Sequence, residues 1–179
     1  MQVNPAPSAF RQQLLGAVPR LRRYARSLVF EDAQSDDLVQ STLERALTHW
    51  HQFDQRRDIV VWLLSIAHNA HQDMRRKESR MQIVDPTQLQ TAQDAQGGDP
   101  GVDVGLRLDL LAALARLTPE QREPLLLVCV EQLSYAEVAE VMHIPVGTVM
   151  SRVCRARATL RALLEAPSRP GPAHLRRVV

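Results

Sequence analysis

The chain has 179 residues, 22 of them basic and 20 acidic, a formal net charge of +2 and 45% hydrophobic residues. This length suits one or two small domains, and the near-neutral total charge means that any binding of nucleic acid must depend on local basic clusters. Aromatic residues make up only 4% of the chain and alternation of β-branched residues is absent, so we expect an all-α fold.

The sequence contains no segment of the kind that targets a chain to a membrane. No apolar run approaches the roughly 20 residues needed to cross a bilayer, and the start, MQVNPAPSAF, lacks the basic and apolar segments of a secretion signal. We therefore expect a cytoplasmic protein. Cys129 and Cys154 fall within helical apolar patterns, so we expect both to be small buried side chains in a reducing compartment.

Residues 1–7 form a proline-bearing arm that we expect to be mobile. A first helix is predicted after Ser8, a candidate cap, because leucine, valine and alanine then recur at helical spacing. Pro19 interrupts this pattern and is expected to kink or divide the helix.

A second helix is predicted to open at Ser35, where acids follow at the positive end of its dipole. Leu38 falls outside the apolar stripe of this helix, beside Asp37 and Gln40. Two interpretations stay open. Leu38 either marks a surface for a partner or widens the stripe that faces the core.

A third helix is predicted to begin after Asp58, which is placed to cap it. Polar, basic and aromatic side chains are expected on its outer faces, namely Trp62, Asn69, His71, Asp73, Arg75, Arg76 and Lys77. The terminal cations suit the negative end of the helix dipole. Basic, aromatic and amide side chains on one helix would equally suit single-stranded DNA.

Residues 81–105 are rich in Gln, Gly, Asp and Pro and contain no Lys or Arg. Such a segment buries too little apolar surface to order itself, so it is predicted to be a flexible acidic linker. As a random coil its ends would lie about 25–30 Å apart. We expect few contacts between the halves that it joins, which would act as separate modules until a binding partner fixes their geometry.

Residues 106–166 predict a second helical domain. Leu110, Leu114 and Leu117 share one face of its first helix. Thr118 is expected to cap the next helix, with Pro119 in the first helical position and Gln121 completing a capping box. Residues 167–179 form a proline-rich basic tail that we expect to be disordered.

A helix-turn-helix is predicted near the end of this second domain. Ser134 and Glu137 form a capping box for its first helix, and Pro145 separates that helix from the second. The second helix is basic and contains no acid before Glu165. Two short helices of which the second is basic are typical of DNA-binding helix-turn-helix units. The alternative is a helical hairpin with a solvated basic face.

We find no catalytic or metal-binding motif in the sequence. His68 and His71 lie three residues apart, and His49 and His51 two apart. Such pairs can bind metal, but no carboxylate or cysteine is spaced to complete either set. We therefore expect no enzyme activity, no cofactor and no metal.

Taken together, these segments resemble a bacterial sigma factor of the extracytoplasmic-function (ECF) family. The motifs are DDLVQSTLERALTHW at 36–50, WLLSIAHNAHQDMRRK at 62–77 and LTPEQREPLLLVCVEQLSYAEVAEVMHIPVGTVMSRVCRAR at 117–157. The resemblance implies a region 2-like domain over residues 8–80 and a region 4-like helix-turn-helix domain over residues 106–166. It also implies that the linker lies in the RNA exit path of the polymerase.

The resemblance further implies partners and residue roles. Asp37, Leu38, Val39 and Gln40 would dock on the β′ clamp helices of RNA polymerase core. Promoter −10 DNA would meet Trp62, Asn69, His71, Asp73, Arg75, Arg76 and Lys77, with Asn69 and Asp73 lining a pocket for a flipped base. The −35 element would meet Thr148, Met150, Ser151, Arg152, Arg155 and Arg157. An anti-sigma factor is the expected inhibitor, and either polymerase or this inhibitor is expected to fix the geometry of the two halves.

Three departures from the family pattern bear on the promoter sequence. His68 and His71 are not the residues most often found beside Asn69, and Met150 stands where Lys or Arg is common. Residues 58–61 stand where the family usually has a more polar or aromatic start to the helix that follows.

Two other functions stay open. An ordinary helix-turn-helix regulator would leave residues 36–77 without a task, and an antagonist that mimics a sigma factor would need a degenerate recognition helix.

Overall fold

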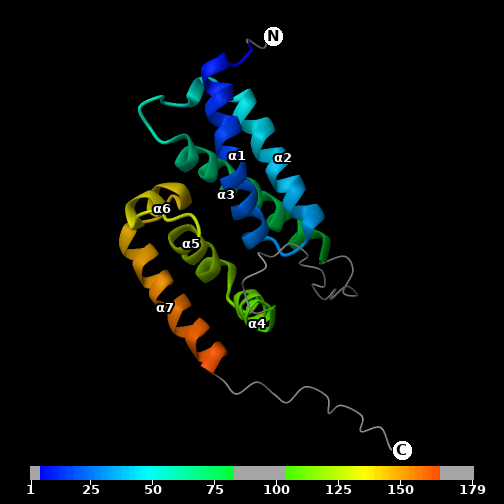
Figure 1. Cartoon of the computed structure of the whole chain (residues 1–179), viewed down its shortest axis with the longest axis vertical. Helices are drawn as coiled ribbons and strands as arrows, with labels where there is room; N and C mark the ends of the chain where they lie inside the picture. The colour runs from blue at the N-terminus through cyan, green and yellow to red at the C-terminus, as the bar shows by residue number, and fades with distance from the viewer. Residues whose placement is uncertain (1–4, 83–103, 166–179) are drawn as a thin grey trace, which may run out of the picture.

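The computed structural model describes residues 5–82 and 104–165, and within these ranges the chain is helical with no strand (Figure 1). The elements are α1 (Ser8–Leu28), α2 (Asp32–Thr48), the 3₁₀ helix η1 (Trp50–Gln52), α3 (Ile59–Gln82), α4 (Val104–Ala115), α5 (Pro119–Cys129), α6 (Tyr135–Met142) and α7 (Val146–Glu165). The all-α prediction is confirmed. Residues 1–4, the predicted tail and most of the predicted linker lie outside the described residues. At the two ends of the predicted linker, residues 81–82 belong to α3 and residues 104–105 to α4.

The first helix differs from its prediction at its start, and Pro19 does not divide it. Pro7, and not Ser8, is the N-cap of α1, and Ser8 is the first helical residue. Pro19 lies inside α1 on an exposed face, and the helix runs on past it to Leu28. The loss of one backbone hydrogen bond at Pro19 is tolerated here because α1 packs along both α2 and α3. Ala6 is also buried, so the arm before α1 joins the core at this point.

The starts of α2 and α3 were predicted with different success. α2 begins at Asp32, three residues before the expected Ser35, and its N-cap Glu31 makes no side-chain capping bond. Asp58 does cap α3, because its Oδ1 accepts a hydrogen bond of 2.7 Å from the backbone N–H of Val60. This contact satisfies one of the amide groups left free at a helix start.

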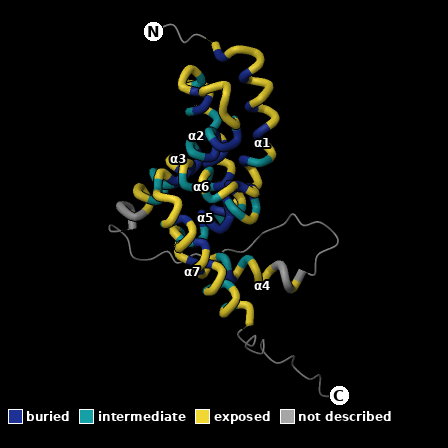
Figure 2. The backbone as a smooth tube through the Cα atoms, turned by 90° about the vertical axis from the view of Figure 1, so that its left-hand side faces the viewer, coloured by how far each residue is buried: buried dark blue, intermediate teal, exposed yellow. Residues whose placement is uncertain are grey.

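The buried face of α2 is wider than its apolar stripe indicated (Figure 2). Leu38 is fully buried, as are its neighbour Val39 and the polar Thr42. The Thr42 hydroxyl donates to the backbone carbonyl of Leu38 at 2.7 Å, which allows a polar residue to face the core. The interpretation of Leu38 as an exposed partner contact is therefore wrong. Leu38 widens the core.

In the second half, α5 and α6 pack against α7, and α4 lies against α7 as well. Leu117 is buried but Leu110 is exposed, so the predicted inner face of α4 holds only toward its C-terminal end. Thr118 is the N-cap of α5, but its side chain makes no capping bond, and the predicted capping box with Gln121 is wrong. Pro119 has no N–H, so the first helical position leaves no free amide at this helix start.

Both cysteines are exposed, which contradicts their predicted burial. Cys154 lies on the side of α7 that faces away from Val149 and Val153, the side chains that pack against the core. Cys129 is the last residue of α5, where the helix leaves the core. An apolar residue type in a helical pattern was a weak guide here, because α7 is buried on one side only and Cys129 lies beyond the buried residues 123–127 of α5.

The two halves lie against each other, with α5 packed on α1 and α6 packed on α3 (Figure 1). Hydrogen bonds join residues more than 100 positions apart, such as Arg20 and Glu131. The expectation that few contacts join the halves is wrong for this structure. We call the surface where α1 and α3 meet α5, α6 and the α5–α6 loop the seam.

Candidate nucleic-acid interface

The helix-turn-helix forms as the sequence predicted. The backbone N–H of Ser134 donates to Glu137 Oε2 at 2.7 Å, and the N–H of Glu137 donates to Ser134 Oγ at 3.3 Å. Hydrogen bonds from the Ser134 hydroxyl and backbone lower the pKa of Glu137. α6 then ends at His143, whose φ of 54° is left-handed, and Pro145 accepts the first backbone bond of α7. The capping box and the proline break are confirmed.

α7 has one buried face and one polar face. Val149, Val153 and Ala156 are fully buried against the rest of the second half. Residues three, four and seven positions apart share a helix face. This spacing gathers four of the six predicted −35 residues on one side of the helix, namely Thr148, Ser151, Arg152 and Arg155.

The other two predicted −35 residues, Met150 and Arg157, lie on the opposite flank of α7. Met150 is 51% exposed. Arg157 Nη2 lies 3.9 Å from Cys129 Sγ at the end of α5, and this contact is the main cause of its raised pKa. The predicted −35 set is therefore divided between two sides of the helix.

Arg152 and Arg155 differ in their surroundings. The Arg152 side chain is 23% exposed and lies 3.8 Å from the carboxylate of Glu120 at the start of α5. Arg155 is exposed, and its Nε donates at 3.3 Å to the backbone carbonyl of Ser151 in its own helix. Arg155 is thus the freer of the two to meet an outside acceptor.

α3 presents an outer face on which Asn69 is exposed, and Asp73 follows it one turn later. Asp73 accepts a hydrogen bond of 3.1 Å from Arg45 Nη2 on α2, which fixes its carboxylate while leaving its side chain 46% exposed. Arg76 and Lys77 are exposed beyond it. An amide and an oriented carboxylate side by side are suited to hydrogen-bond the edge of a base.

Two residues predicted for this outer face are placed differently. The Trp62 ring packs 5.2 Å from Phe53 and 5.9 Å from Phe10, measured between ring centroids, so it is half-buried in an aromatic cluster. His71 is buried and lies on the side of α3 that faces α5, not on the outer face. Its burial lowers the pKa of His71 to about 4, so the ring is neutral at pH 7. Arg75 lies beside it on the seam.

On α2, Asp37 and Gln40 are exposed while Leu38 and Val39 point into the core. Gln40 Nε2 donates to Glu44 Oε1 at 2.9 Å one turn later. The four residues predicted to bind polymerase therefore divide into two exposed polar side chains and two buried apolar ones.

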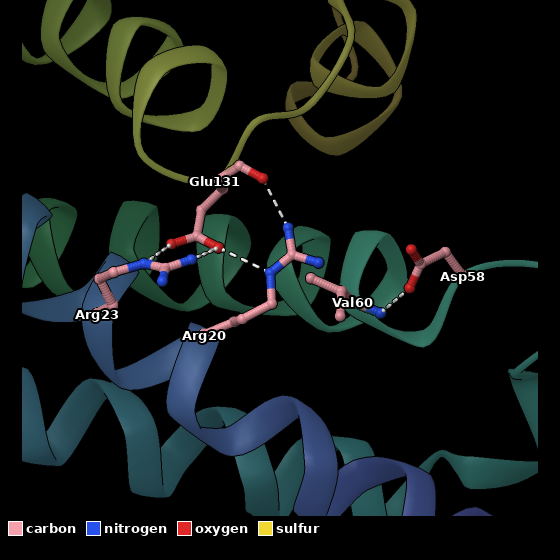
Figure 3. Close-up of polar contacts among 5 residues, drawn as sticks. All are labelled: Arg20, Arg23, Asp58, Val60 and Glu131. Atoms are coloured by element: carbon pink, nitrogen blue, oxygen red, sulfur yellow. Dashed lines mark hydrogen bonds and ion pairs between the residues drawn. The ribbon is translucent and has the colours of Figure 1, made fainter.

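Glu131 is the centre of a polar cluster in the seam, in the loop between α5 and α6 (Figure 3). Its fully buried carboxylate accepts bonds from Arg20 Nε at 3.1 Å and from Arg23 Nε and Nη2 at 2.9 and 3.1 Å. Arg20 Nη2 also donates to the Glu131 backbone carbonyl at 2.6 Å. Hydrogen bonding to Glu131 is the main cause of the raised pKa of Arg23.

Glu123 on α5 anchors a second seam contact. Its buried carboxylate accepts a 2.5 Å hydrogen bond from the Tyr24 hydroxyl, and His68 Nδ1 lies 2.6 Å from the same oxygen. Burial, and then the nearby carboxylate, raises the pKa of Tyr24 well above its usual value. Nearer the surface, Arg57 forms an ion pair with Glu140 of α6.

The seam residues were not singled out from the sequence. A signal was present, because Glu123 and Glu131 flank the apolar run PLLLVCV and acids are rarely found in a buried segment without partners. The described residues hold no helix long and apolar enough to span a membrane. Nor does any group of three or more His, Cys, Asp or Glu side chains in residues 5–82 and 104–165 form a candidate metal site.

These features define a two-part helical protein that carries a helix-turn-helix in its second half. A helix-turn-helix is typical of DNA-binding transcription factors. Residues 107–160 match the family model for Sigma-70, region 4, and residues 14–68 match the model for the Sigma2 domain of PhyR.

Two curated proteins resemble this chain over most of their length. The ECF RNA polymerase sigma factor EcfG of Rhodopseudomonas palustris (strain TIE-1) is 36% identical over 162 residues, covering 89% of this chain and 87% of that protein. RNA polymerase sigma factor CnrH of Cupriavidus metallidurans is 32% identical over 160 residues, covering 83% and 82%. The chain belongs to the ECF family of RNA polymerase sigma factors.

Solved structures agree with this assignment. The sigma factor RpoE in complex with the anti-sigma factor NepR from Bartonella quintana matches with a TM-score of 0.80 and 30% identity, over 90% of this chain and 99% of that one. CnrH in complex with the cytosolic domain of CnrY matches with a TM-score of 0.66 and 29% identity, over 89% and 90%.

Proposed function

We propose that this sigma factor directs RNA polymerase core to promoters through two DNA-contacting faces, the outer face of α3 and the polar face of α7. The observation that supports this most is their common construction. Each helix packs against neighbouring helices and still presents exposed polar and basic side chains at one-turn spacing on its outer face. The protein acts by binding, not by catalysis, and works in the cytoplasm where promoters are found.

The outer face of α3 is proposed to hold a flipped base of the −10 element. Unstacking a base costs a few kcal/mol, which specific contacts must recover. Asn69 supplies an amide that both donates and accepts, and Arg45 holds the Asp73 carboxylate in position beside it. Arg76 and Lys77 are proposed to contact the phosphates of the opened strand. Trp62 would act through the aromatic cluster that supports this face.

The polar face of α7 is proposed to enter the major groove at the −35 element. Thr148, Ser151, Arg152 and Arg155 share that face, so they are the candidates for base contacts. Arg157 and Met150 lie on the opposite flank, and from there Arg157 suits a phosphate of the DNA backbone better than a base edge.

Asp37 and Gln40 are proposed as the direct contacts with the clamp helices of polymerase core, because their side chains are exposed on α2. Leu38 and Val39 would hold that turn of α2 on the core. Since Leu38 is fully buried, Leu38→Arg would place a charge in the core and unfold the first half, so it does not test docking. Asp37→Arg does, and Asp36→Arg, also exposed, is its neighbouring control.

An anti-sigma factor is proposed as the inhibitor, because the structural relative RpoE of Bartonella quintana is in complex with the anti-sigma factor NepR. The seam fixes the two halves relative to each other, whereas promoter engagement requires one half at each of two separated elements. We propose that the closed seam is the inactive arrangement and that it opens when polymerase and promoter bind.

Run-off transcription tests the function directly. Core polymerase with the purified protein is given a library of randomised promoters, and the transcribed templates are sequenced. We expect enrichment of one two-part motif. Asn69→Ala should lower discrimination at one −10 position by about 1–3 kcal/mol. Gln72→Ala, on the same helix, is the control. No enrichment, combined with tight binding of an anti-sigma factor, would instead identify an antagonist that mimics a sigma factor.

A further inference from the structure

A pocket of about 220 Å³ opens at the seam, beside the buried face of α3. Its walls come from both halves. The first half contributes Leu28 at the end of α1, Phe30 in the loop after it, and His71, Arg75 and Glu78 on α3. The second half contributes Arg122 on α5. One water occupies about 30 Å³ in the liquid. The pocket is therefore large enough for a ligand of several heavy atoms.

Two polar atoms at this pocket lack partners among the described residues. Three buried side-chain atoms among the described residues have no hydrogen-bond partner, and two of them, His71 Nδ1 and Arg122 Nε, belong to residues that line it. His71 is only 5% exposed. Buried polar groups almost always have a partner, so two orphaned nitrogens beside one pocket point to a ligand that accepts hydrogen bonds.

The charges in the pocket point the same way. Burial lowers the pKa of Arg122, and the nearby guanidinium of Arg75 lowers it further. Both residues line the pocket, which therefore holds two neighbouring cations. Neither forms an ion pair with any described residue, and Arg122 instead stacks 4.8 Å from the centroid of the Phe30 ring. Glu78 is the single acid on the wall. The Glu123 carboxylate nearby is already bonded to Tyr24 and His68.

We infer that this pocket binds a compact oxyanion of the phosphate class, a free phosphate or diphosphate, between Arg75 and Arg122. The planar guanidinium groups match phosphate oxygens in paired hydrogen bonds. A neutral His71 contributes one more N–H. Because Arg75 lies on α3 of the first half and Arg122 on α5 of the second, the anion binds only when the halves are closed, and it favours the closed seam.

Isothermal titration of the full-length chain with diphosphate, at constant ionic strength, tests this site. We expect saturable binding with one site per chain and a raised melting temperature. Arg122→Gln should weaken binding at least tenfold, and so should Arg75→Gln, which carries less risk to the fold. Arg26→Gln removes the same charge from an exposed position outside the pocket and should leave binding unchanged. Equal losses in all three variants would show general charge attraction and overturn the site.

Two further experiments distinguish a free anion from a DNA phosphate and test whether diphosphate binding depends on the closed seam. Short duplex DNA should not displace diphosphate. Displacement that is lost in Arg122→Gln would assign the pocket to a DNA phosphate and overturn binding of a free anion. Glu131→Gln, which loosens the seam outside the pocket, should also weaken diphosphate binding. Unchanged affinity in a variant that small-angle scattering shows to be open would overturn the bridging role. No arm uses transcription, so the site and the proposed function fail independently.

Discussion

Arg20 and Arg23 of the seam differ from Arg155 of α7 in what they bind. In the seam, Arg20 and Arg23 donate to the carboxylate of Glu131, which is fully buried. On α7, Arg155 is exposed and donates only to a backbone carbonyl of its own helix. Arg20 and Arg23 are satisfied within the chain, whereas Arg155 keeps most of its five N–H donors for an outside acceptor.

The difference shows that counter-charge, not the number of basic residues, separates structural arginines from those available for DNA. A buried carboxylate that loses its partners is costly, whereas an exposed ion pair contributes little. Substitutions in the seam should therefore change the closed arrangement and the stability of the protein. Substitutions on the outer faces should change DNA binding and leave the fold intact.

Glu123→Ala should have the largest effect. It leaves the Tyr24 hydroxyl and His68, both buried, without their acceptor. Breaking a buried network of this kind costs roughly 3–5 kcal/mol of unfolding free energy. Urea denaturation followed by circular dichroism measures it. Glu120→Ala, one turn earlier on α5 and 74% exposed, is the matched control and should stay near the wild-type value. Similar losses in both variants would contradict the account.

Acid should destabilise the protein through His71, whose pKa is lowered from 6.5 to about 4 by burial. Between these pH values the unfolded chain binds a proton that the folded chain does not. The contribution of the neutral ring is thus complete above about pH 6.5 and is lost as the pH falls toward 4, by up to about 3 kcal/mol.

Denaturation between pH 4 and 7, in buffer free of phosphate, checks this prediction. His71→Gln should flatten the dependence on pH because the titrating ring is removed. His143→Gln, at an exposed position in the turn before α7, should keep the wild-type slope. An unchanged slope in His71→Gln would mean that other groups carry the effect.

Glu131→Gln should have a smaller effect, because the side chains of Arg20 and Arg23 are 34% and 53% exposed and water can replace part of what they lose. We expect a loss of roughly 1–3 kcal/mol, the size of hydrogen bonds to a charged group. A double-mutant cycle with Arg23→Gln measures the coupling. Arg22→Gln, at the exposed neighbouring position, should show no coupling to Glu131. Equal coupling to Arg22 would place the effect outside the seam.

Arg155→Ala should have the smallest effect on stability, within about 0.5 kcal/mol, because it is a surface substitution. It should nevertheless weaken −35 binding. If Arg155 contacts a base, the preference at one position relaxes, and if it contacts phosphate, the salt slope of binding falls by about one. Arg161→Ala, on the same helix but beside Glu165 at 4.0 Å, is the control. Binding unchanged by Arg155→Ala would mean that α7 docks by another face.

Local chemistry could be predicted from the sequence where neighbours in the chain decide the structure. The capping box of Ser134 and Glu137, the break at Pro145 and the cap at Asp58 all depend on residues within three positions of each other. The buried stripe of α7 could be predicted for the same reason. Most features of the helix-turn-helix could therefore be predicted from the sequence.

Burial on the second side of a helix could not be predicted. Leu38 and His71 lie outside the main apolar stripes, and each is buried because another helix covers it. The seam was missed for a related reason. Arg20 and Glu131 are 111 positions apart, and helical periodicity carries no information about a pair at that separation. The linker composition favoured independent halves, but the contacts that join them lie in the helices and in the loop before α6.

The closed seam and its opening on promoters can be tested by cross-linking Arg57→Cys to Glu140→Cys. These positions form an ion pair across the seam, and their side chains are 54% and 43% exposed. Cys129→Ser and Cys154→Ser, both at exposed positions, remove the competing thiols. A short bis-maleimide should cross-link the free protein rapidly, and the rate should fall sharply in the complex with core polymerase and promoter. No cross-link in the free protein, or an undiminished rate in the transcribing complex, would contradict the account.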